Sequence, residues 1–253
     1  MSDLEFDRRS EIESLLADDE TTLGRMWTYQ QEGLSAKQMA DREGLPTTDW
    51  VSNNNSLIAV LRDGHIPDSP SLSQAAARRV RSWLKSKNLS PQLRDALSNQ
   101  ESLLTSRAED KRAQASEVAD AVKASKDAEA SATAGIYVYT LTHYLRYPLD
   151  QDSGKTLLKV GHSSTDAFYR ASSQGRLTAL PEDPILLRIY PVDASAAAER
   201  EFHDWLRDAD HAPSRARRGG SEWFVTSTKF LDRVAKSKGL NVIVVNEFDV
   251  DDE

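Results

Sequence analysis

The first 90 residues carry apolar side chains at the spacing of amphipathic helices. Residues three and four apart lie on the same face of a helix, so each group predicts a helix with one buried face. The first two groups are Ile12, Leu15 and Leu16, then Leu23, Met26 and Trp27. We therefore expect an all-α region over residues 1–90.

Residues 91–132 differ in composition from the segments on either side. They contain no aromatic residue and are rich in Ala, Ser, Lys, Glu and Asp. Few large apolar side chains are available for burial, so the pattern indicates a solvated helical spacer or a flexible one. A fragment that begins near residue 130 is then expected to fold by itself.

From Gly135 onward, short β-branched and aromatic runs alternate with helical segments. Strands are predicted at Ile136–Leu141, Leu157–Gly161, Ile185–Val192, Trp223–Thr226 and, more briefly, Asn241–Asn246. Helices are predicted at Asp166–Ser173, Ala194–Ala209 and Lys229–Lys238. This alternation predicts an α+β domain over residues 133–246, with a small mixed sheet flanked by helices. An acidic, frayed tail is expected at residues 247–253.

The amino-acid composition excludes several kinds of site and of protein. The 253 residues include no cysteine, which excludes disulfides and every cysteine-based zinc site. No stretch approaches the roughly 20 apolar residues of a membrane-spanning helix, and the N-terminus lacks the apolar core of a signal peptide. We therefore expect a cytoplasmic protein with no membrane partner.

Charge is distributed unevenly, although the net charge is −8. Residues 71–90 carry five basic side chains and no acidic one. A local positive field matters more for phosphate binding than the total charge does. The sequence therefore remains compatible with DNA as a partner.

Several short motifs follow one another in the last 120 residues. Gly135-Ile136-Tyr137 opens the first predicted strand, and Leu158-Lys159-Val160-Gly161 lies in the second. Arg170, Glu199 and the run Glu222-Trp223-Phe224 come later in the chain. In this order and spacing, residues 133–240 resemble the GIY-YIG nuclease superfamily. They are most similar to its variant branch with a YKIG motif, named for a bacteriophage open reading frame.

The resemblance implies a metal-dependent DNA endonuclease that uses Mg²⁺ or Mn²⁺. Glu199 would be the metal ligand, because hard cations prefer carboxylate oxygen. Arg170 would hold the scissile phosphate through its planar guanidinium. Tyr137 or Tyr139 would orient or deprotonate the attacking water. His203 follows Glu199 by one turn on the same helix face.

The helix that carries Glu199 has an apolar stripe expected to pack on the sheet. This stripe consists of Ala198, Phe202, Trp205 and Ala209. Glu199 lies at its margin, where a carboxylate stays accessible.

One feature departs from the family pattern. The tyrosine of the YIG half is missing, and Leu158 and Lys159 occupy the candidate positions. Lys159 or His162 would then supply a polar group beside the site, and His162 has either a role as base or a structural one. The alternative function is a DNA-binding or regulatory protein on a nuclease fold that no longer cuts.

Two basic segments are candidate DNA contacts. The first is a helix near Ala76–Lys87, in which Arg78, Arg79, Arg81 and Lys85 surround an apolar stripe. Such a helix also suits acidic protein or membrane surfaces. The second is a loop with Arg215, Arg217 and Arg218, which contact phosphate or simply face solvent.

A third candidate lies in the acidic N-terminal region. Ser35–Leu45 resembles the first helix and turn of a helix-turn-helix unit, with a second helix beginning near Thr47. Asn53, Asn54 and Asn55 would then offer amides to base edges. A packing or protein-interaction role is the alternative.

Overall fold

The computed structural model describes residues 6–131, 133–150, 155–163, 182–211 and 222–248. The chain divides into two compact units, with the boundary between Glu117 and Val118. Each unit has its own hydrophobic core. Among the described helices, none is both long and apolar enough to cross a bilayer.

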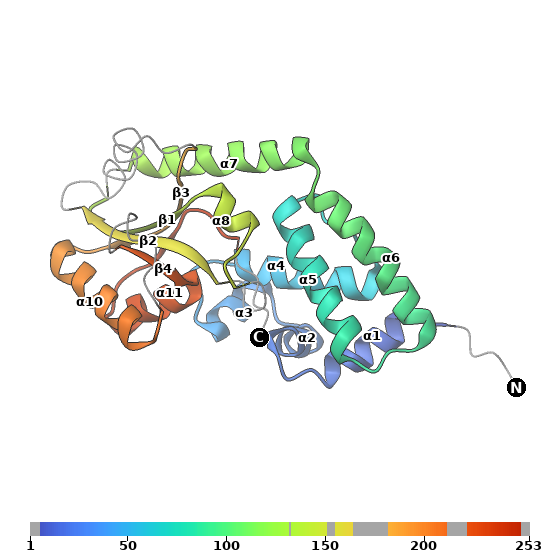
Figure 1. The fold of residues 1–253 in the computed structure, drawn as a ribbon. Coiled ribbons are helices and arrows are strands. Elements are labelled where there is room, and N and C mark those ends of the chain that lie inside the picture. The colour runs from blue at the N-terminus through green and yellow to red at the C-terminus, as the bar shows by residue number, and fades with distance from the viewer. Residues whose placement is uncertain (1–5, 132, 151–154, 164–181, 212–221, 249–253) are drawn as a thin grey trace, which may run out of the picture. The chain divides into compact units, whose positions relative to one another are not determined.

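The first unit is built from helices only in its described part (Figure 1). They are α1 (Arg8–Ala17), α2 (Thr22–Gln31), α3 (Ala36–Glu43), α4 (Asp49–Asp63), α5 (Pro70–Ser86), α6 (Pro91–Ala108) and the start of α7 (Lys111–Glu129). The predicted stripe residues Ile12, Leu16, Leu23, Met26 and Trp27 are all buried, and Leu15 packs against the same core.

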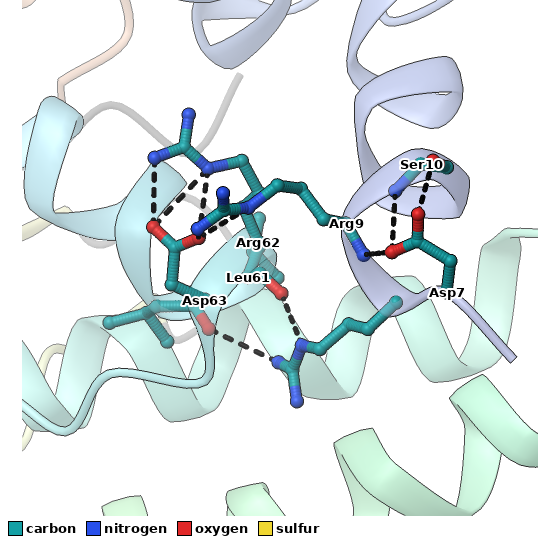
Figure 2. Close-up of polar contacts among 8 residues, drawn as sticks. Asp7, Arg9, Ser10, Leu61, Arg62 and Asp63 are labelled. Atoms are coloured by element: carbon teal, nitrogen blue, oxygen red, sulfur yellow. Dashed lines mark hydrogen bonds and ion pairs between the residues drawn. The ribbon is translucent and has the colours of Figure 1, made fainter.

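Figure 2 shows how α1 is attached to the end of α4. Asp7 caps α1 by accepting hydrogen bonds from the backbone of Arg9 and Ser10. The Arg9 guanidinium reaches Asp63 at 2.7 Å, and Arg62 donates to the same carboxylate at 2.8 Å. Hydrogen bonds from Arg62 above all, and from Arg9, lower the pKa of Asp63 to about 2.

The described residues of the segment 91–131 are largely helical, in α6 and α7, and α6 is not a solvated spacer. Helix α6 packs along α5 and buries Leu93, Leu97 and Leu104 in the core of the first unit. These leucines share one helix face, so even a segment with few apolar residues covers its neighbour. The second half of α7 belongs to the other unit, where the Ser125 hydroxyl accepts a hydrogen bond from Leu186 N–H at 3.1 Å.

The second unit contains a five-stranded sheet with the order β4-β2-β1-β3-β5 (Figure 1). The strands are β1 (Gly135–Thr140), β2 (Thr156–Ser163), β3 (Ile185–Pro191), β4 (Trp223–Thr226) and β5 (Ile243–Val244). The described helices are α8 (Thr142–Arg146), α10 (Ser195–Asp208) and α11 (Thr228–Ser237). The α+β class is thus confirmed, but the sheet is antiparallel throughout rather than mixed. Hydrophobic periodicity reveals strands, not their direction.

The two faces of the sheet have different environments. Ile136 and Val138 point toward α10 and α11 and join the main core of this unit. Tyr137 and Tyr139 alternate with them and therefore point to the opposite face, where α7 contributes Ala128. We call this second face the tyrosine face.

The apolar stripe of α10 differs from the predicted one. Phe202 is buried, and Leu206 lies beside it in the core. Trp205, predicted to pack on the sheet, is 47% exposed instead. The stripe follows positions 198, 202 and 206, which are spaced by four residues and leave Trp205 at the edge.

A buried polar cluster connects β3 with α11 and the C-terminal segment. The guanidinium of Arg188 is ion-paired with Asp232 at 3.1 Å and with Glu247, and it donates to the Asn246 carbonyl at 2.8 Å. Tyr190 donates its hydroxyl hydrogen to Asp232 at 2.7 Å. Buried charge is tolerated where ion pairs and hydrogen bonds satisfy it in this way.

Candidate functional site

Tyr137 lies across the neighbouring strand at Gly161. The two residues are partners in the β1–β2 register. A Cβ atom at position 161 would lie 2.5 Å from the Tyr137 hydroxyl and 2.6 Å from Cζ. Only glycine leaves room for the ring there. This gives a physical reason why Tyr137, in the Gly135-Ile136-Tyr137 motif, lies opposite a glycine on β2.

The phenols of Tyr137 and Tyr139 form a buried pair on the tyrosine face. Their rings stack with centroids 5.7 Å apart. Burial raises the pKa of Tyr137 to about 12 and also raises the pKa of Tyr139 well above its ordinary value. Both hydroxyls are therefore protonated near neutral pH, which suits them to donate a hydrogen bond rather than to remove a proton.

Lys159 faces the same side of the sheet as the two phenols. Its register partners are Tyr139 on β1 and Trp223 on β4. The ammonium lies 5.2 Å over the Tyr139 ring and 3.0 Å from the Glu222 carboxylate. Leu158, the other candidate for the missing tyrosine position, points into the opposite core. Of the two, Lys159 is thus the one beside the phenols.

His162 and Glu199 meet where the end of β2 passes α10. The His162 Nε2 lies 3.5 Å from the Glu199 Oε2, and Nδ1 lies 3.2 Å from the Ser195 hydroxyl. Ser195 is buried and thereby fixes the orientation of the ring. The Glu199 side chain stays 15% exposed. Tyr137 lies on the other face of the sheet, but the charge of Glu199 contributes to raising its pKa.

The divalent cation that the sequence implies would bind at Glu199, beside His162. Among the described residues, no group of three or more acidic or histidine side chains is arranged to hold a metal. Mg²⁺ is commonly bound by one or two carboxylates, several waters and substrate phosphates. Glu199, with His162 beside it, fits that mode and not an all-protein cage.

His203 is held in the interior and not beside the phenols. Its Nε2 lies 2.9 Å from the Val160 carbonyl, and its ring packs on Phe224 at 4.9 Å. The side chain thereby joins α10 to β2. The one-turn spacing from Glu199 predicted that His203 lies on the same helix face as Glu199. In the structure, the His203 side chain lies in the interior instead.

Comparison with known proteins shows a similarity in the second unit. Residues 136–238 match the family model of the T5orf172 domain. The match is compatible with a DNA-related role, in binding or in nuclease chemistry. No curated protein and no solved structure matches the chain.

The T5orf172 match includes Tyr137, Lys159, His162 and Glu199. Two further residues of this constellation, Ser195 and Glu222, were not recognised as site candidates in the sequence. Glu222 was noted only within its Glu-Trp-Phe motif, and its contact with Lys159 depends on the β2–β4 register. Arg170, Arg215, Arg217 and Arg218 lie outside the described residues.

Most of the basic side chains of α5 that were candidate DNA contacts make contacts within the first unit. Arg79 is only 5% exposed. Arg81 pairs with Glu101 at 3.1 Å, and Lys87 pairs with Asp19 at 3.0 Å. Arg78 is half-buried, whereas Lys85 is exposed. These contacts hold α5 in the helical core and weaken the case for a cationic DNA-binding face.

The helix-turn-helix resemblance concerns α3, α4 and the turn between them. Gly44 ends α3 with φ of 65°, a left-handed conformation that favours glycine. Helix α4 begins at Asp49, slightly later than predicted. Asn54 is buried and donates to the Trp50 carbonyl, while Asn55 accepts from Gln30. Two of the three predicted base-reading amides therefore already have intramolecular partners.

Proposed function

We propose that the T5orf172 domain of this chain is a metal-dependent DNA endonuclease with a GIY-YIG-type site. The observation that carries the proposal is the seating of Tyr137 over Gly161, with Lys159 over the neighbouring Tyr139 ring and with Glu199, the partner of His162, contributing to the raised pKa of Tyr137. Hydrogen-bond donors, a cation and a carboxylate are the groups that hydrolysis of a phosphodiester requires.

In this proposal each side chain is assigned a role that is compatible with its state in the structure. Tyr137 is protonated and orients the attacking water by donating a hydrogen bond. Lys159 supplies positive charge for a non-bridging phosphate oxygen. His162, oriented by Ser195, accepts the proton that the water loses. A divalent cation held by Glu199 would supply charge neutralisation at the phosphate.

A second candidate function is DNA binding without cleavage. It is favoured by the absence of the YIG tyrosine, whose candidate positions hold Leu158 and Lys159, and by the raised pKa of Tyr137, which removes a phenolate base. Both functions require DNA, so cutting itself is the distinguishing property.

The test is to incubate the purified full-length chain with supercoiled plasmid, with Mg²⁺, with Mn²⁺ and with excess chelator. The endonuclease predicts nicked or linear products with a metal and intact plasmid with chelator. Plasmid binding with no cleavage under any metal would favour the second function.

A further inference from the structure

A continuous series of aromatic rings leads away from Tyr139. Trp223 meets Tyr139 edge-on with centroids 5.7 Å apart, and Tyr144 approaches Trp223 at 6.1 Å. His143 follows at 5.6 Å from Tyr144, and Tyr147 lies 5.1 Å from His143. We call these five residues the aromatic run.

The aromatic run changes from buried to exposed along its length. Tyr139 is buried, Trp223 and Tyr144 are half-buried, and His143 is exposed. Tyr147 at the outer end is 56% exposed. A monomeric domain gains nothing in its own core from a large ring in that position, so an exposed aromatic beside a candidate site suggests a ligand.

The outer rings are held in place by the backbone. His143 and Tyr144 lie in α8, which packs on β2, where the Thr156 hydroxyl donates to the Tyr144 carbonyl at 2.6 Å. Tyr147 directly follows α8, and its backbone N–H donates to the His143 carbonyl. Arg146 lies in the same helix, between the two tyrosines. The rings therefore belong to a fixed surface, and ordering them on binding costs little.

We infer that the aromatic run binds unpaired nucleobases of DNA, so that the strand beside the proposed cleavage site is held single-stranded or distorted. Aromatic side chains stack on the faces of successive bases with little regard to sequence. In a duplex those faces are covered by neighbouring pairs, so only unpaired nucleotides reach the rings. The inference rests on the proposed function, because DNA is the ligand.

Fluorescence anisotropy with the full-length chain in excess chelator tests the inference without cleavage. The probes are a labelled oligo(dT) strand and the same backbone with abasic sites. We expect oligo(dT) to bind more tightly, and Tyr147→Ala to weaken that binding by roughly tenfold. Tyr147→Phe keeps the ring and should bind like the wild type, whereas Tyr147→Leu should resemble Tyr147→Ala.

Trp205→Ala is the matched control, because Trp205 is an exposed aromatic residue of the same unit outside the aromatic run. It should leave oligo(dT) binding unchanged. Equal affinity for the abasic strand, full binding by Tyr147→Ala, or an equal loss in Trp205→Ala would each overturn the inference.

Plasmid nicking by the same proteins separates this inference from the proposed function. If the wild type never cuts but binds oligo(dT) through Tyr147, the endonuclease proposal fails and the base-binding surface stands. If the wild type cuts plasmid but Tyr147→Ala binds both strands normally, only the base-binding surface is lost.

Discussion

The hydroxyl of Tyr137 occupies the space that a side chain at Gly161 would need. The ring is buried and cannot turn away into solvent. The absence of a side chain on β2 therefore determines where the phenol lies on β1.

Replacing Gly161 with Ala should destabilise the second unit and displace the phenol. The new Cβ would lie 2.5 Å from the Tyr137 hydroxyl, and overpacking of this kind costs about 1–3 kcal/mol. We expect a lower melting temperature and a large loss of nicking. In a Tyr137→Ala background the same change should cost much less, because the clashing atoms are gone. A full cost in both backgrounds would show that Gly161 is needed for another reason.

Glu199 should be required for any metal-dependent cutting. We expect Glu199→Ala to abolish plasmid nicking with Mg²⁺ and Mn²⁺ while the helix stays intact, since alanine favours helix. Glu201→Ala is the control: Glu201 lies on the same helix but pairs with Lys238 at the surface. Nicking that survives Glu199→Ala, or equal loss in both variants, would contradict the assignment of the metal site.

Arg170 and the arginine loop are expected to have separable roles. Arg170→Ala should abolish cutting with only a modest loss of DNA affinity, because its proposed task is to hold the reacting phosphate. Replacing Arg215, Arg217 and Arg218 together should weaken binding and lower its salt dependence by up to about one unit of slope per contact. Binding titrations at several salt concentrations measure this slope. An unchanged slope would mean that the loop faces solvent.

Stability of the first unit should depend on the ionisation of Asp63. Its pKa is lowered in the folded state to about 2, so its contribution is present above the ordinary value near 3.8 and is lost as pH falls through 2. Asp63→Asn should therefore cost about 1 kcal/mol near neutral pH, a difference that disappears in acid. Melting curves from pH 6 to pH 2 measure it. Asp41→Asn, at an exposed i,i+4 pair with Lys37, should show little change.

The boundary of an independently folding C-terminal fragment should lie near Val118, not near residue 130. A fragment from Val118 keeps the contacts of Ser125 with Leu186 and Asn246, which a fragment from Ala130 loses. We expect both fragments to contain the sheet, with the shorter one melting several degrees lower. Thermal unfolding followed by circular dichroism compares them. Equal melting temperatures would show that α7 adds no stability.

Local patterns in the sequence predicted most of the strands and helices, but not their partners. The strand Trp223–Thr226 was placed correctly because its β-branched and aromatic residues stand between polar segments. By contrast, the pairing of Lys159 with Glu222 depends on β2 lying beside β4, 60 residues later in the chain. Single-sequence periodicity contains no information on such long-range register.

The sequence also did not show which of the polar side chains are buried. Arg79 was selected from the basic pattern of Ala76–Lys87, and His203 from its one-turn spacing after Glu199. In the structure, Arg79 is enclosed by the helical core, and His203 donates from its Nε2 to the Val160 carbonyl. Tyr137, Glu199 and His162 were selected from motif order; Glu199 and His162 lie side by side in the structure, whereas Tyr137 lies on the opposite face of the sheet.

The buried polar cluster around Arg188 affects when the second unit can fold during synthesis of the chain. Its two carboxylate partners, Asp232 and Glu247, follow it by 44 and 59 residues. Until both have left the ribosome, closing the core would bury a guanidinium without full compensation. We therefore expect the second unit to remain open on the ribosome while the first unit folds, and to close only after Glu247 has left the ribosome.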